Sequence, residues 1–284
     1  MVTYKDVDAA LEQLGYPWRP KRNPVARLGL PEFRRRLGYT PGRRELSRRQ
    51  AERVARGQRH VRRPSTRYPP GVDLRDAGGS DFVTPVRDQG TCASCVAFGT
   101  LAALEATRQL AAGDPTLAPD YSEAHLFFCE GRRSCLVGWN ITTALEILKE
   151  RGVVDERCYR YADGSWWSGC RKLCPDWESR ITRISSWCRL GTAGEMKKWL
   201  AAEGALVARM SVYEDFRFYG SGVYRNVLGG WTGDHCIACV GYDDIAGCWI
   251  CKNSWWTSWG DDGFFQIGYG ECGVGSEMWG VRFA

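Results

Sequence analysis

Cys95 has the sequence surroundings of an activated nucleophile. It stands in the stretch DQGTCASCVAFG and opens an apolar run with helical spacing. A thiol at a helix N-terminus feels the positive end of the backbone dipole, which lowers its pKa and favours the thiolate. Such a nucleophile needs a base that becomes its cationic partner, and the base needs an orienting group.

The chain offers three histidines as that base. His60 lies in a basic segment, and His125 lies inside the helical stretch SEAHLFF, where we expect it to be packed. His235 begins the strand-like run HCIACVGYDD, and a strand end can project it into a cleft. Asn253, in KNSWW, offers an amide that accepts the imidazole N–H and fixes the tautomer. His235 and Asn253 follow Cys95 by 140 and 158 residues.

The elements that must hold these residues change in type along the chain. Apolar residues have helical spacing at 95–113, 122–131 and 140–152, where Gly152 suits a C-terminal cap. Strand-like patterns follow at 205–213, 235–244, 247–256 and 262–270. The order predicts an α+β fold with a helical lobe at about 88–180, a β-rich lobe at about 181–284, and a cleft between them.

The first 67 residues differ from the rest in charge. They hold sixteen Arg and two Lys against six acids, a net charge of +12, whereas residues 68–284 carry −6. Opposite charges allow the two parts to attract each other. A short amphipathic helix is predicted near 5–15, a helix at 43–56, and a Pro-rich linker at 62–71.

Thirteen cysteines suit an oxidising compartment, although a reduced protein with many buried thiols is also consistent with them. The number is odd, so at least one thiol stays unpaired within the chain. We expect a soluble protein of unknown compartment, because no apolar stretch approaches membrane-spanning length and the N-terminus lacks a signal-peptide core.

The cysteine spacing also admits other chemistry. Cys236, Cys239, Cys248 and Cys251 have the C-x2-C spacing of a zinc ribbon, but their inner residues favour strands, on which positions i and i+3 diverge. We expect these four cysteines to be core thiols, and a cross-strand disulfide between them stays an alternative. Cys92 and Cys95 have thioredoxin-like spacing without an adjacent βαβ pattern. We therefore expect no metal and no other cofactor.

Four ordered blocks carry a family resemblance: PPGVDLRDAGG, PVRDQGTCASCVAFG, DHCIACVGYDD and CWICKNSWWTSWGDDGFFQIGYGECGVGSE. They cover most of 68–280 and resemble the papain-like cysteine peptidases of the papain/cathepsin type. The resemblance implies a two-lobed fold with a β-barrel-like second lobe and a catalytic domain at 68–284. It makes Cys95 and His235 a thiolate–imidazolium pair oriented by Asn253. It makes Gln89 the side-chain donor to the oxyanion, together with the Cys95 N–H.

The resemblance also implies substrate-binding positions, namely Val137, Gly138, Trp139, Asp234, Trp255, Glu277 and Arg209. Trp255 would shield the His–Asn hydrogen bond from water. Glu277 would line the bottom of the S2 pocket and accept a basic or a hydrophobic P2 residue. An ion pair between Glu277 and Arg209 would weaken the preference for a basic P2 residue. Val137 stands where the family has a glycine, and should narrow the cleft.

The resemblance implies disulfides between Cys92 and Cys135 and between Cys129 and Cys170. Cys158 and Cys174 flank the second bridge, and their proximity suggests a third. The usual partner of Cys272 is missing, so that family bridge is absent or rewired.

These features predict an endopeptidase that forms a thioester with protein or peptide substrates. We expect a monomer that binds neither membranes nor nucleic acid. Residues 1–67 would be a pro-region that inhibits the cleft; a nucleic-acid or anionic-surface arm and a disordered tail stay open as alternatives. A ligase or acyltransferase with the same triad is an alternative function. So is an inactive binding module, because Val96 replaces an aromatic residue that the family has after its nucleophile.

Overall fold

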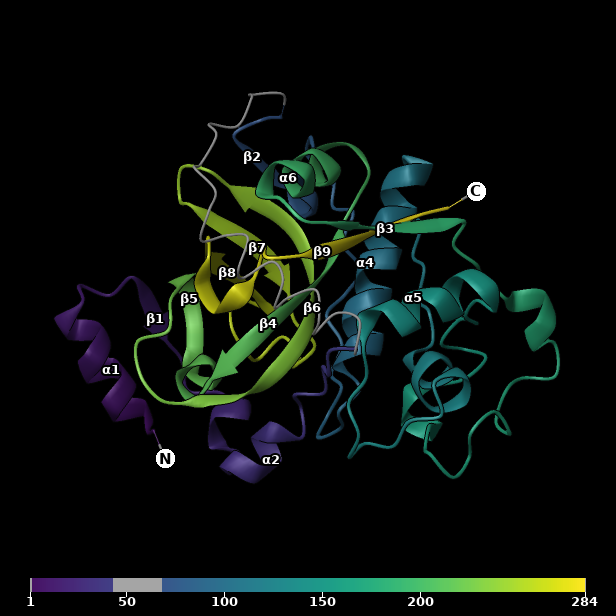
Figure 1. Ribbon diagram of the computed structural model, residues 1–284, viewed down its shortest axis with the longest axis horizontal. Helices are drawn as coiled ribbons and strands as arrows, with labels where there is room; N and C mark the ends of the chain where they lie inside the picture. Colours follow the sequence, from purple (N-terminus) through teal and green to yellow (C-terminus); the bar gives the residue numbers. More distant parts are fainter. Residues whose placement is uncertain (1, 43–67, 284) are drawn as a thin grey trace.

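Two lobes meet along the helix that begins at Cys95 (Figure 1). The computed structural model describes residues 2–42 and 68–283. The helical lobe contains α4 (Cys95–Ala112), the π-helix η3 (His125–Glu130) and α5 (Ile141–Glu150), with short 3-10 turns at Tyr161–Asp163 and Trp177–Arg180. The other lobe is built on a nine-stranded sheet. The α+β prediction is therefore confirmed.

The sheet gathers strands from both ends of the described chain. Its strands are β1 (Trp18–Pro20), β2 (Gly71–Asp73), β3 (Ser186–Leu190), β4 (Leu206–Tyr213), β5 (Tyr219–Tyr224), β6 (Trp231–Asp243), β7 (Cys248–Lys252), β8 (Phe264–Gly268) and β9 (Met278–Arg282). They follow the order β1-β5-β8-β7-β6-β4-β9-β3, with β2 also paired to β6. The β-barrel-like expectation needs correction, because this hydrogen-bonded path does not close among the described residues. It ends at β1 on one side and at β3 on the other.

Smaller helices surround the sheet. They are α1 (Tyr4–Gln13), η1 (Val25–Arg27), α2 (Leu30–Arg34), η2 (Leu74–Asp76), α6 (Ala193–Ala202), η6 (Glu214–Phe218) and η7 (Glu271–Gly273). A Thr3 capping box starts α1, and a Thr192 capping box starts α6. The prediction of an amphipathic helix near the N-terminus is matched by α1. Within 2–42 and 68–283, no helix has the length and apolarity that a membrane crossing requires.

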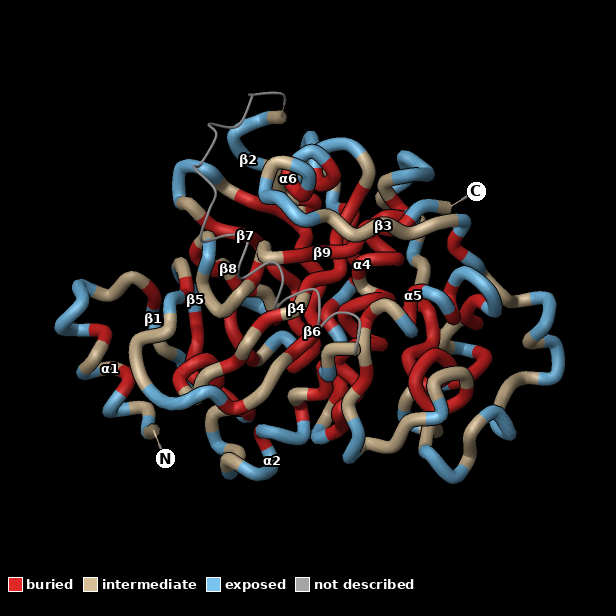
Figure 2. The backbone as a smooth tube through the Cα atoms, viewed as in Figure 1, coloured by how far each residue is buried: buried red, intermediate tan, exposed pale blue. Residues whose placement is uncertain are grey.

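The described N-terminal residues, 2–42, are called the N-terminal segment below. They contribute buried residues to the core of the sheet lobe (Figure 2). β1 pairs antiparallel with β5 and so extends the sheet by one strand. Five apolar side chains of this segment are almost fully buried there: Val7, Leu11, Trp18, Val25 and Phe33. The helix predicted at 43–56, most of the linker at 62–71, and His60 lie outside the described residues.

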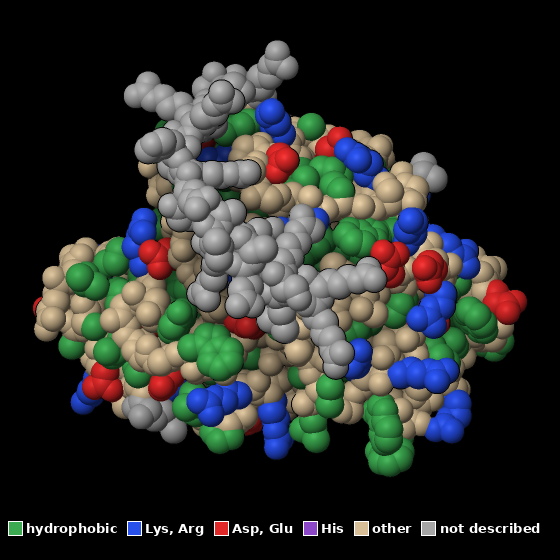
Figure 3. Space-filling view, in the orientation of Figure 1, with side chains coloured by type: hydrophobic (Ala, Val, Ile, Leu, Met, Phe, Trp, Pro, Cys, Tyr) green, Lys and Arg blue, Asp and Glu red, His purple; other side chains and the backbone are tan. Residues whose placement is uncertain are grey.

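Figure 3 shows basic and acidic side chains next to one another at the rim of the visible face.

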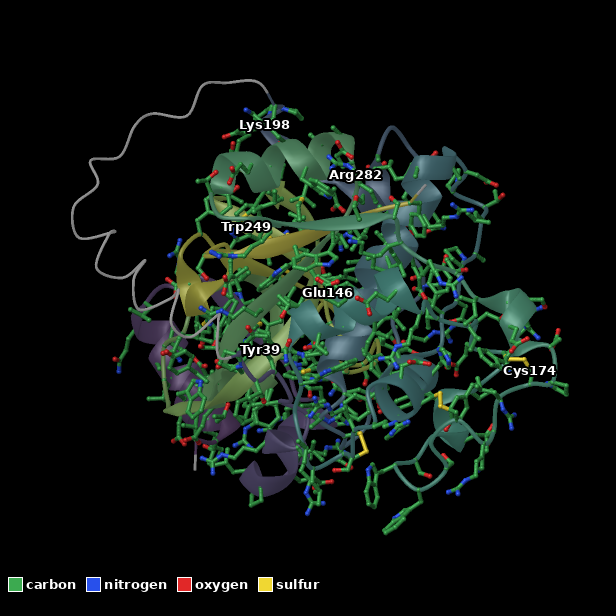
Figure 4. The ribbon with its side chains drawn as sticks, turned by 45° about the vertical axis from the view of Figure 1, so that its right-hand side comes forward. Tyr39, Glu146, Cys174, Lys198, Trp249 and Arg282 are labelled. Atoms are coloured by element: carbon green, nitrogen blue, oxygen red, sulfur yellow. A yellow bond between two sulfur atoms is a disulfide. The ribbon has the colours of Figure 1, made fainter. Side chains whose placement is uncertain are left out.

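Three disulfides link Cys92 to Cys135, Cys129 to Cys170, and Cys158 to Cys174. All three lie in the helical lobe (Figure 4). The other seven cysteines are thiols, among them Cys272 and the cross-strand partners Cys239 and Cys251. The alternative of a cross-strand disulfide between β6 and β7 is therefore not realised.

The segment at 122–131 is helical, as predicted, but it widens into the π-helix η3. Leu126, Phe127, Phe128 and Cys129 are buried in succession along it. His125 is buried at its start, as the helical pattern predicts.

Gly99 lets α4 lie directly on β6. A Cβ atom at this position would lie 2.8 Å from the Cys236 sulfur and 2.9 Å from the Ile237 nitrogen. The absence of a side chain therefore brings the first turns of α4 against β6 at the residues that follow His235. This contact couples the two lobes at the place where the candidate nucleophile and base meet.

We predict that Gly99→Ala lowers the free energy of unfolding by about 1–3 kcal/mol, because the added methyl overpacks the α4–β6 contact. Gly191→Ala is the matched control, since a Cβ there has no atom within 4 Å. Urea unfolding of both variants checks the prediction. Equal stability of the two variants would show that the helix does not depend on this close approach.

Candidate active site

Cys95 begins α4 and is fully buried. Its sulfur accepts a hydrogen bond from the Gly38 N–H at 3.2 Å, and the main chain of Cys236 also donates to it. Burial raises the pKa of the thiol to about 11, and the main-chain donors only partly oppose this rise. The dipole of α4 was expected to favour the thiolate. In the covered site, burial outweighs that effect because the charged form has lost its water.

His235 lies in β6 and is held by Asn253. Its Nε2 is 2.8 Å from Asn253 Oδ1. Asn253 Oδ1 also accepts the Ser254 N–H, so it faces both groups as an acceptor, and Nε2 carries the proton. The other ring nitrogen, Nδ1, makes no hydrogen bond of normal geometry among the described residues, and the Arg36 main chain lies near the ring. Burial lowers the pKa of His235 to about 4, so the imidazole is neutral in this form.

Trp255 covers the His–Asn pair. Its ring centroid lies 4.9 Å from that of His235, with the planes tilted by 33°. The tryptophan is buried, and Phe33 of α2 packs edge-on against it at 5.4 Å. The hydrogen bond between His235 and Asn253 is therefore shielded from water on this side.

Gln89 directs its amide toward the start of α4. Its Oε1 accepts a hydrogen bond from Ser254 Oγ at 2.7 Å, which fixes the amide orientation. Its Nε2 donates to the Cys92 carbonyl at 2.7 Å and to the Arg36 carbonyl at 3.0 Å. The donor is thus engaged by a carbonyl oxygen of the N-terminal segment.

Residues 38–40 fill the cleft between the lobes. The Gly38 carbonyl accepts from the Trp139 N–H at 2.7 Å, and the Thr40 N–H donates to the Trp139 carbonyl at 2.7 Å. The Tyr39 N–H donates to the Asp234 carbonyl at 3.1 Å, and Figure 4 shows Tyr39 where the two lobes meet. The pairing of Tyr39 with Trp139 is parallel.

Gly38 passes through a gap that admits no side chain. A Cβ atom on it would lie 2.0 Å from the Ala93 carbonyl oxygen. On the opposite side, a Cβ on Gly138 would lie 2.3 Å from the Gly38 carbonyl oxygen. Gly38 has no distinguishing sequence signal in RRRLGYT, so sequence reasoning missed it.

The cleft segment is also held by charge. Arg36 Nη1 pairs with Asp88 Oδ1 at 2.8 Å, next to Gln89. The charge asymmetry between 1–67 and the rest predicted attraction without naming this pair.

The remaining predicted substrate-binding residues have the following surroundings. Glu277 is 3% exposed, with Arg189 Nε at 2.8 Å and Arg209 Nε at 3.9 Å, so Arg209 does lie near it. Arg189 was not singled out from the sequence. Asp234 Oδ1 accepts from Ser211 Oγ at 2.8 Å. Val137, which was expected to narrow the cleft, is 51% exposed. The segment at 38–40 passes beside the neighbouring Gly138.

A sequence model described as "Papain family cysteine protease" matches residues 68–281. The chain belongs to this family. Over 232 residues it is 32% identical to Cathepsin B-like CP3 of Giardia intestinalis, a match that covers 77% of this chain and 76% of that protein. Pro-cathepsin H of Bos taurus is 31% identical over 217 residues, which cover 73% of this chain and 62% of that protein. The chain is therefore a papain-like cysteine peptidase, as its sequence blocks predicted.

Solved structures share the fold. The structure titled proCathepsin B S9 from Trypanosoma congolense has a TM-score of 0.77 at 23% identity, covering 99% of this chain and 98% of that one. The Carica candamarcensis cysteine protease CMS1MS2, in complex with E-64, has a TM-score of 0.62 at 27% identity. That match covers 76% of this chain and 99% of the other. The papain-like fold prediction is confirmed by these likenesses.

We predict that Gly38→Ala displaces the segment from the cleft, because the methyl would overlap the Ala93 carbonyl. Alkylation of Cys95 by iodoacetamide at pH 7, read by mass spectrometry, should then be at least about tenfold faster than in the unchanged chain. Gly42→Ala is the matched control, since a Cβ there lies 3.9 Å from its nearest neighbour. The same rate in both variants would contradict the prediction.

Proposed function

We propose that the chain is an endopeptidase in which Cys95 is the nucleophile, His235 the base and acid, and Asn253 the orienting residue. The observation that carries this proposal is the hydrogen bond from His235 Nε2 to Asn253 Oδ1 beneath Trp255. It fixes the neutral tautomer that leaves Nδ1 as the proton acceptor. Cys236 directly follows His235, and its main-chain N–H donates to the Cys95 sulfur. His235 Nδ1 and the Cys95 thiol therefore belong to one site.

In the open cleft, His235 would take the Cys95 proton, and the thiolate would attack the scissile carbonyl carbon. The oxyanion would be held by Gln89 Nε2, which binds the Arg36 carbonyl in the covered site, and by the Cys95 N–H. The imidazolium then gives its proton to the leaving amine, leaving a thioester. Water, deprotonated by His235, cleaves the thioester and restores the thiol.

We propose that residues 1–67 are an inhibitory pro-region. Three observations support this assignment over an arm for nucleic acid. Gly38 covers the Cys95 sulfur, Arg36 engages Gln89, and apolar side chains from Val7 to Phe33 are buried in the catalytic domain. The carbonyl at Gln89 and the N–H at the sulfur come from different peptide bonds of this segment, those after Arg36 and before Gly38. Several structures with the same fold are titled as proforms.

The surroundings of Glu277 indicate which P2 side chain the S2 pocket would accept. Its carboxylate is already engaged by Arg189 and lies near Arg209, so an incoming Lys or Arg would have to compete with two guanidinium groups. We therefore propose that P2 is preferentially hydrophobic and that the basic preference is weak. The three disulfides favour an oxidising compartment, and we propose a monomer.

The peptidase assignment predicts that Cys95→Ala and His235→Ala each abolish cleavage of a fluorogenic peptide library after acid treatment of the chain. Cys272→Ala, which changes another thiol, should keep the activity of the unchanged chain. Retained activity in Cys95→Ala would contradict the mechanism. Product analysis with added amines separates hydrolysis from ligation, since a ligase would give amide products.

Acidification should open the covered site. The imidazole has its ordinary pKa of 6.5 once hydrated, but about 4 when covered, so between pH 6.5 and 4 it is mainly the open form that binds the proton. The stability that the covered form has above pH 6.5 is lost progressively as the pH falls toward 4. We predict that self-cleavage between about residues 55 and 72 accelerates over this range, as N-terminal sequencing would show. A rate that is independent of pH, or equal cleavage in Cys95→Ala, would contradict this prediction.

A further inference from the structure

The hydroxyl of Tyr161 holds both ends of the loop that links Gln89 to the start of α4. Its oxygen lies 3.0 Å from the Gln89 main-chain carbonyl and 2.7 Å from Ser94 Oγ. A carbonyl oxygen only accepts, so the phenol proton goes to Gln89, and the Ser94 hydroxyl donates to Tyr161. Gln89 and Ser94 are both buried, and Tyr161 is partly buried.

Ser94 occupies the N-cap of α4, immediately before Cys95. A serine at this place usually accepts a hydrogen bond from an N–H of the first helical turn. Here it makes no such bond, because its hydroxyl is directed to Tyr161. The positive end of the helix is therefore left to the residue that follows, Cys95.

Tyr161 is itself held in place from three sides. Its N–H donates to Glu156 Oε1 at 2.7 Å. Its ring packs edge-on against Phe98 at 4.8 Å and stacks on Phe128 at 6.1 Å. Phe98 lies on α4, one turn after Cys95, so the ring contacts the helix whose start its hydroxyl anchors. The Cys158–Cys174 disulfide closes the stretch that carries Tyr161.

Burial raises the pKa of Tyr161 well above its usual value, so the hydroxyl stays protonated at any pH at which the enzyme works. It is therefore a permanent donor to Gln89.

We propose that Tyr161 is a positioning residue of the peptidase: its hydroxyl fixes Gln89 and Ser94, and through them the oxyanion donor and the nucleophile. This inference rests on the proposed function. Without the hydroxyl, the Gln89 carbonyl loses a donor, and the Ser94 hydroxyl becomes free to cap α4. Both changes act on the transition state more than on substrate binding.

Tyr161→Phe in the full chain, activated by acid, tests the proposal. Tyr159→Phe is the matched control, because its hydroxyl bonds Ser168 Oγ and the Gly169 carbonyl, both at 2.8 Å, on the same disulfide-linked stretch. We expect kcat to fall about tenfold in Tyr161→Phe with KM within about twofold, as the loss of buried hydrogen bonds predicts. The pH profile of Cys95 alkylation should also move to higher pH. Tyr159→Phe should change neither.

Ser94→Ala supplies the second variant. Alone it should lower kcat about threefold, and on the Tyr161→Phe background it should add little, because the two residues act through one bond. If Tyr161→Phe does not fold, the kcat of Ser94→Ala decides. Unchanged kcat and an unchanged alkylation profile in these variants would overturn the role of Tyr161. An inactive unchanged chain would instead refute the proposed function.

Discussion

The Gly38 backbone lies between Ala93 and Gly138 and donates its N–H to the Cys95 sulfur, and the state of the site depends on this contact. It covers the Cys95 sulfur, while Arg36 of the same segment lies near His235. Both groups then favour their neutral forms, the thiol with its pKa raised to about 11 and the imidazole with its pKa lowered to about 4. The two groups that exchange a proton in the proposed mechanism are thereby held uncharged.

The contact persists because the segment is anchored on either side of it. β1 extends the sheet beside β5, and Trp18 and Phe33 are buried in the core of the sheet lobe. Phe33 contacts Trp255, the residue that covers the His–Asn hydrogen bond. Arg36 pairs with Asp88 beside Gln89. The segment thus occupies the site with its main-chain groups.

The sequence allowed the α+β fold, the helix at 95–113 and the strands around His235 to be predicted, because hydrophobic period and cap residues are local signals. The proposed nucleophile, base and amide were predicted from residue type, spacing and family resemblance, and their roles stay predictions. The open sheet path was not foreseen, because strand closure depends on pairing between distant segments. Nor were Gly38, Arg189 and Tyr161, since each acts through contacts that only the folded chain creates. The expected thiolate illustrates the same limit: the helix dipole is local, whereas the burial that outweighs it comes from residues 57 positions earlier in the chain.

Nitrogen-15 NMR of the histidine rings would test the central claim most directly, because the chain has only three histidines. In the intact chain at pH 6, the account predicts that His235 is a neutral imidazole with its proton on Nε2, which titrates only near pH 4. After the N-terminal segment has been removed, the same ring should become protonated at pH 6. An imidazolium signal for His235 at pH 6 in the intact chain would contradict the account.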